Sequence, residues 1–224
     1  MPTATFFRLP EEKRRRLLDA CWSELTGVRF TDVSINRIIT EAHIPRGSFY
    51  QYFSDKEDLI HYLLDNMREY FISLLQGILV EARGDLFAMP LMAYDRFFSQ
   101  RGDTDPMLAL FIKLVTLNKG LDLQNFIGSP QGFIGEQEHF LPDPLWEVVD
   151  AARLRENSRE YADHVFHLTC AVLAFAIVET LQCPARADQA RAPGRTARIR
   201  EQTKVRMDLL RYGGAAEGYK EETL

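Results

Sequence analysis

Polar side chains that can bind nucleic acid are concentrated between residues 46 and 56 of this 224-residue chain. They carry guanidinium, hydroxyl, amide and ammonium groups, at Arg46, Ser48, Tyr50, Gln51, Tyr52 and Lys56. Lysine and the tyrosine hydroxyl bind phosphate oxygens, whereas the forked groups of arginine, asparagine and glutamine can distinguish base edges. Gly47 lets the backbone approach a partner closely, because it has no side chain. The segment therefore favours contact with double-stranded DNA.

Two short helices joined by a tight turn are predicted to present these groups. Ser34 can cap the first helix with its hydroxyl, and the turn follows at His43-Ile44. Pro45 then fixes the backbone φ at the entry of the second helix. The residues predicted to be buried by the first helix are Ile35, Ile38, Ile39 and Ala42. Such a pair matches a helix-turn-helix, whose second helix can enter the major groove of DNA.

The rest of the chain also has helical spacing, so the sequence predicts an all-α protein of about nine helices. A first helix should run from Pro10 to Gly27. The run Ser54-Asp55-Lys56-Glu57 fits a capping box, in which Ser54 and Glu57 cap each other's backbone, and it should start a long helix that ends near Arg83-Gly84. Further helices are predicted around 86–101, 105–119, 143–155, 159–182 and 197–212, and long connections at 120–142 and 183–196.

Charge is distributed unevenly along the chain. The net charge is −5, yet residues 1–53 contain eight basic and six acidic residues, a net +2, which leaves −7 for the remainder. Phosphate attracts a basic segment and repels an acidic one. The polarity is therefore typical of a molecule that presents its N-terminal part to DNA.

Several other classes of protein are disfavoured. The N-terminal residues lack the apolar stretch of a secretory signal, so a cytoplasmic location is expected. The three cysteines suggest neither a disulfide framework nor a zinc site, although Cys183 could sense redox state. Among enzyme motifs, we find no GxSxG, GxxxxGK[ST] or HExxH, and His164 and His167 are more simply explained as structural or surface residues than as metal ligands. The sequence therefore predicts no enzyme, no metal and no cofactor.

The segment from Ser34 to Leu59 resembles the DNA-binding head of the TetR family of transcription regulators. The matching positions are Ile38, Ala42, Ile44, Gly47, Ser48, Tyr50, Tyr52, Phe53, Lys56, Glu57 and Leu59. Two positions depart from the family pattern. His43 replaces a turn glycine, where a positive φ is expected, and Pro45 replaces a serine cap. Both departures bear on the operator that is preferred.

The resemblance implies which residues contact DNA. Lys56 should hold a phosphate at the start of the long helix. The residues implied to face DNA are Ser34, Asn36, Arg37, Arg46, Gly47, Ser48, Tyr50, Gln51 and Tyr52.

It also implies a two-part organisation: a head of residues 1–55, a ligand-binding and dimerisation body of residues 56–214, and a tail of residues 215–224 that is expected to be disordered. The last two helices carry broad apolar surfaces that could form a homodimer. Candidates for an effector pocket are Phe97, Phe111 and Trp146, with His139 or His167. The function implied is that of a repressor that binds a palindromic operator as a dimer and is released by a small, apolar effector. The alternative is a helical ligand-binding or scaffold protein with a degenerate head.

Overall fold

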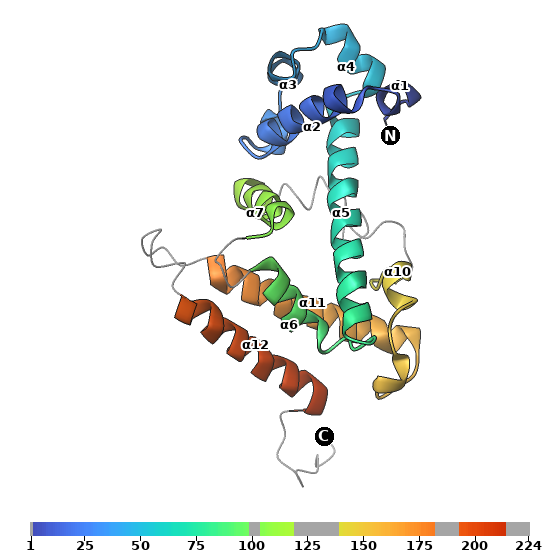
Figure 1. The fold of residues 1–224 in the computed structure, drawn as a ribbon, viewed down its shortest axis with the longest axis vertical. Coiled ribbons are helices and arrows are strands. Elements are labelled where there is room, and N and C mark those ends of the chain that lie inside the picture. Colours follow the sequence, from blue (N-terminus) through green and yellow to red (C-terminus); the bar gives the residue numbers. More distant parts are fainter. Residues whose placement is uncertain (1, 99–103, 119–138, 182–192, 214–224) are drawn as a thin grey trace, which may run out of the picture. The chain divides into compact units, whose positions relative to one another are not determined.

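The computed structural model describes residues 2–98, 104–118, 139–181 and 193–213 (Figure 1). Across these residues the structure is helical and contains no strand, which confirms the all-α prediction. The α-helices are α1 (Ala4–Phe7), α2 (Glu11–Leu25), α3 (Ile35–Glu41), α4 (Arg46–Tyr52), α5 (Lys56–Glu81), α6 (Met89–Phe97), α7 (Pro106–Asn118), α10 (Asp143–Trp146), α11 (Arg159–Leu181) and α12 (Pro193–Tyr212). Two short 3-10 helices are η1 (Phe30–Asp32) and η2 (Ala151–Arg153). The predicted connections 120–142 and 183–196 and the tail lie largely or wholly outside the described residues.

Contacts within the chain define two compact units. The first comprises Met1–Phe71 together with Pro106–Gln137, and the second comprises Ile72–Asp105 together with Glu138–Leu224. The boundary predicted at residue 55 therefore differs from this division in two respects. The first turns of α5 belong with the head, and so does α7.

The first unit is built around one apolar core. Helix α2 buries one stripe of its surface, and α3, α4 and α5 close over it, as the 3.6-residue period requires. Its fully buried members include Leu17, Leu25, Ile38, Phe49, Phe53, Ile60 and Met67. Burial of such side chains stabilises a fold by about 1.5–3 kcal/mol each, so this core can hold the two short helices α3 and α4 in place.

Helix α1 was not predicted from the sequence. Its Phe6 is fully buried and packs edge-to-face on Tyr62 of α5, with 5.3 Å between the ring centroids. The residue before α1, Thr3, donates its backbone N–H to the carbonyl of Tyr52 at 2.9 Å. The N-terminal segment thus satisfies carbonyl groups at the end of α4, which otherwise lack partners within that helix.

In the second unit, α6, α11 and α12 pack against one another (Figure 1). The helix predicted over 143–155 is wrong in its length, because α10 ends at Trp146 and only η2 follows. Asp150 explains the break. Its backbone N–H donates to the carbonyl of Gly84 at 3.0 Å, and its side chain accepts the N–H of Ala152, so a new turn starts there.

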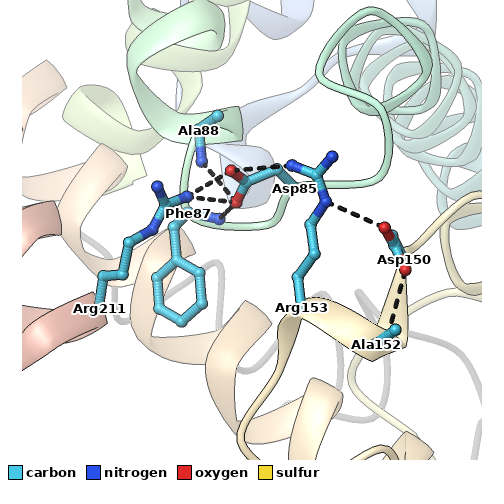
Figure 2. Close-up of polar contacts among 7 residues, drawn as sticks. All are labelled: Asp85, Phe87, Ala88, Asp150, Ala152, Arg153 and Arg211. Carbon is cyan, nitrogen blue, oxygen red and sulfur yellow. Dashed lines mark hydrogen bonds and ion pairs between the residues drawn. The ribbon is translucent and has the colours of Figure 1, made fainter.

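Asp85 joins three parts of the second unit (Figure 2). Its buried carboxylate accepts from Arg211 of α12 at 2.6 Å and from the backbone N–H of Phe87 at 2.9 Å. Arg153 of η2 lies 3.5 Å away. Gly84 beside it has φ +74°, and a Cβ there would lie 2.3 Å from the backbone nitrogen of Asp150. Only glycine fits this close approach. The contacts of Asp85 and Gly84 together hold the end of α12, the start of α6 and η2 near one another.

Helices α11 and α12 leave large apolar side chains exposed. On α11 these are Leu168, Phe175, Val178 and Leu181, and on α12 they are Val205, Leu209, Leu210 and Tyr212. By length and composition alone α11 could cross a membrane, and 28% of its most apolar window is buried within the protein. The presence of a second exposed apolar surface on α12 favours packing against protein instead.

Candidate nucleic-acid interface

The turn between α3 and α4 has the geometry that the sequence predicts. His43 adopts φ 53°, in the left-handed region that non-glycine residues seldom occupy. Arg16 of α2 donates from Nε to the carbonyl of Ala42 at 2.9 Å and so caps the end of α3. Pro45 precedes the first residue of α4, with φ −61°. The basic start of α2 therefore helps to hold the turn.

The start of α3 is held by Glu24 rather than by a serine cap. The Ser34 hydroxyl makes no capping hydrogen bond, so that prediction is wrong. Instead, Glu24 is buried and accepts the backbone N–H of Ser34 at 2.8 Å. The same carboxylate accepts from Nη2 of Arg37 at 2.7 Å, and this hydrogen bond raises the pKa of the arginine. Arg37 thus stays exposed but is oriented by α2.

Three polar side chains connect the exposed faces of α3 and α4. Arg46 donates to Oδ1 of Asn36, and its other terminal nitrogen lies 3.3 Å from the hydroxyl of Tyr50. Its guanidinium carbon lies 5.8 Å from the centre of the Tyr50 ring, within the range of a cation–π contact. The Asn36 and Tyr50 side chains thus hold the Arg46 guanidinium on the exposed face that they share.

Gly47, Ser48 and Gln51 complete this face of α4. Gly47 and Gln51 are exposed, and Ser48 is partly exposed. A Cβ built at Gly47 would meet no atom within 4 Å. The protein itself therefore leaves free space at Gly47 for a partner that approaches the helix backbone.

Tyr52 lies apart from the exposed face of α4, whereas Lys56 keeps donors for a phosphate. Tyr52 is buried, with its ring centroid 6.4 Å from that of Phe6, so it does not share the exposed face. The reason is that α1 covers this side of α4. Lys56 is partly exposed and donates from Nζ to the carbonyl of Thr31 at 3.2 Å. A lysine ammonium has three donors, so two remain for a phosphate.

The cap of α5 is shifted by one residue from the predicted capping box. Asp55, not Ser54, accepts the backbone N–H of Asp58, at 2.7 Å. Asp58, not Glu57, reaches back and accepts the backbone N–H of Ser54 at 3.1 Å. Two aspartates thus bind backbone N–H groups at the start of α5, and they fix the helix start that carries Lys56.

Comparison with known proteins shows what this segment resembles. Residues 17–63 match the model of the bacterial regulatory proteins of the tetR family. This part of the head is therefore similar to the corresponding part of that family. A solved structure of a TetR family transcriptional regulator from Chloroflexus aurantiacus J-10-FL is similar to the chain at 26% identity, over 95% of this chain and 98% of that chain, with a TM-score of 0.48. No curated protein matches the chain.

The candidates for an effector pocket do not belong to one unit. Phe111 of α7 packs in the first unit, where its ring centroid lies 5.8 Å from that of Phe71. Phe97 is buried in the second unit, and Trp146 there lies 5.9 Å from the guanidinium of Arg159. Of the histidines, His167 stacks on Phe140 at 4.5 Å between centroids. These side chains have packing roles that the sequence did not reveal.

Of the described cysteines, Cys21 is buried and Cys170 is partly buried. Burial raises the pKa of Cys21, and it raises the pKa of Cys170 to about 12. Such thiols stay protonated and unreactive near neutral pH. Cys183, the redox candidate, lies outside the described residues. Among the residues that are described, no group of three or more His, Cys, Asp or Glu side chains could hold a metal ion.

Proposed function

We propose that this TetR-family transcription regulator is a cytoplasmic, non-enzymatic repressor that binds a palindromic operator as a homodimer and is released by a small, apolar effector. The observation that carries the DNA-binding part is the exposed face of α4. Arg46, Tyr50 and Gln51 surround Gly47, above which the protein leaves free space. Helix α4 exposes its backbone at Gly47 and carries polar side chains around it. This combination suits the major groove, where close approach and hydrogen-bond donors are both needed.

Homodimerisation is supported by the exposed apolar surface of α11 and α12. Leu168, Phe175, Val205 and Leu209 are each more than half exposed, at 51–53%. Two such helices from each of two chains could bury these side chains in a four-helix interface. A two-fold dimer would pair two heads on the two halves of a palindrome, which increases discrimination beyond that of one head.

Release by an effector requires that the effector bind differently to the two states of the dimer. Aromatic side chains are frequent between residues 67 and 146, which favours an apolar ligand over a charged one. An effector that binds the released state more tightly lowers operator affinity by the ratio of its two affinities.

Selection of bound sequences from random double-stranded DNA tests the proposal. The full-length protein should enrich a palindrome, and binding should weaken as salt rises. Lys56→Ala should lower affinity for all sequences and reduce the salt slope by about one. Tyr50→Phe, which keeps the ring packed on Phe49, should lower affinity about threefold to tenfold if the hydroxyl contacts phosphate.

Lys204→Ala is the matched control, since Lys204 is an exposed lysine of α12 in the second unit. It should bind like the parent protein. The alternative holds if the parent protein enriches no sequence and binds DNA no better than its Lys56→Ala variant. The protein would then be a scaffold with a degenerate head.

A further inference from the structure

A buried amide connects α7 to the head. Asn118, the last residue of α7, is 1% exposed. Its Oδ1 accepts the backbone N–H of Phe30 at 3.0 Å, across 88 residues of sequence, and its Nδ2 donates to the carbonyl of Leu114 at 2.8 Å. Because both ends of the amide have partners, its orientation is fixed. A buried side chain with such a long-range bond is placed to position the backbone that it holds.

That backbone is η1, the turn that leads into α3. Each of its three residues is tied to a different part of the first unit. The N–H of Phe30 binds Asn118, the carbonyl of Thr31 accepts from Lys56 at 3.2 Å, and the carbonyl of Asp32 accepts from Arg37 at 2.8 Å. Two of the side chains implied to contact DNA, Lys56 and Arg37, therefore take their positions from η1.

Helix α7 provides a rigid support for Asn118. Leu114 is fully buried in the core of the first unit, and Met107, Leu110 and Phe111 pack against that core. In sequence, α7 lies far outside the segment 17–63 that matches the TetR-family model. The first unit therefore contains a helix that the family's head motif does not include.

We propose that Asn118 is a positioning residue for DNA binding, which acts by fixing η1 and, through it, Lys56 and the start of α3. The inference rests on the proposed DNA-binding function. Without the Asn118 acceptor, the buried hydrogen bond that joins η1 to α7 is lost, and this loss favours movement of the turn. Contacts to phosphate act over hydrogen-bond distances of 2.7–3.2 Å, so a small displacement of η1 is enough to lose them.

Two substitutions in the full-length protein separate the hydrogen bond from packing. Asn118→Leu keeps the branched shape of the side chain and removes the acceptor, and Asn118→Ala removes both. Both should lower operator affinity about tenfold, the cost of a buried hydrogen bond that is lost. Both should also reduce the salt slope by about one, because Lys56 no longer holds its phosphate. Backbone hydrogen exchange at Phe30 should become faster in both.

Thr169→Val is the matched control in the second unit. Thr169 is fully buried and donates only to the carbonyl of Phe166 in its own helix, at 2.9 Å. This variant should keep the parent's operator affinity and salt slope. If Asn118→Leu fails to fold, as circular dichroism would show, the alanine variant carries the same three measurements.

Parent-like operator affinity in a folded Asn118→Leu variant would overturn the inference, and so would an unchanged salt slope or unchanged exchange at Phe30. Weakening by alanine while a folded leucine variant binds like the parent would also overturn it, because packing would then explain the effect. Failure of the parent protein to bind any DNA is distinct, since it would refute the proposed function itself.

Discussion

Gly47 is the second residue of α4, in a helix that would be more stable with another residue there. Glycine costs a helix about 0.5–1 kcal/mol relative to alanine, because the unfolded chain loses more freedom on folding. Space does not explain its presence, since a Cβ at Gly47 meets nothing within 4 Å. Its φ is not in the left-handed region either. The remaining physical reason for a glycine is an external partner that comes close to the backbone.

Gly47→Ala should therefore separate stability from DNA binding. We expect the free energy of unfolding in urea to rise by about 0.5–1 kcal/mol. We expect operator affinity, measured by fluorescence anisotropy, to fall about tenfold or more, because the new methyl group meets the DNA backbone.

Gly77→Ala in α5 provides the control for this experiment. Gly77 is also exposed, helical and without an atom within 4 Å of a built Cβ. It should stabilise the protein by a similar amount and leave operator affinity unchanged. Equal operator affinity of both alanine variants would show that Gly47 does not lie in the DNA interface.

Side chains on α4 show how far the candidate site could be predicted. The polar groups at Arg46, Tyr50 and Gln51 and the positive φ of His43 were predictable from residue type. The burial of Tyr52 was not, because it depends on α1, a four-residue helix with no periodic pattern of its own. Likewise, the role of Asn118 was not predictable from the sequence, because its partner is a backbone N–H 88 residues away.

At the scale of elements, helix existence was more predictable than helix ends. Periodicity predicted α2, α3, α4, α5, α6, α7, α11 and α12. The predicted ends depended on local capping chemistry, where Ser54, Asp55 and Asp58 offer competing caps within five residues. Which carboxylate caps depends on how α5 meets the preceding turn, and that is decided by packing rather than by the local sequence.

Asp55→Ala should destabilise the protein, and Glu57→Ala should not. Asp55 accepts the Asp58 N–H as the cap of α5, and loss of such a cap costs about 1 kcal/mol. Glu57 is exposed, and the favourable field of the helix N-terminus is worth only a few tenths of a kcal/mol at an exposed site. Urea unfolding of both variants measures the difference. A larger loss of stability for Glu57→Ala than for Asp55→Ala would show that Glu57 caps α5, as the sequence predicted.

At the scale of the whole molecule, the exposed apolar side chains are concentrated on two helices. Of the large apolar side chains that are exposed in the described residues, most lie on α11 and α12. Large apolar patches are rare on proteins that remain monomeric. Ion pairs such as Arg206 with Glu179, at 2.8 Å, already hold the two helices together within one chain. The apolar face is thus presented on a preformed pair of helices, which lowers the entropic cost of binding a second copy.

Leu168→Lys and Leu209→Lys should each convert the protein to a monomer without unfolding it. Both side chains are about half exposed, at 53% and 51%, so a lysine costs the monomer little, whereas burying its charge in a dimer interface is costly. Light scattering at micromolar concentration should fall from twice the chain mass to 25.8 kDa. Affinity for the palindrome should fall toward that for a half-site, because one head then binds alone.

Val80→Lys is the matched control for the dimer face. Val80 lies on α5, outside α11 and α12, and is 60% exposed. This variant should keep the dimer mass and the affinity for the palindrome, because it adds the same charge away from the proposed interface. Dimers that persist in both leucine variants would place the interface elsewhere. Monomers formed equally by Val80→Lys would mean that added charge, and not this apolar face, controls association.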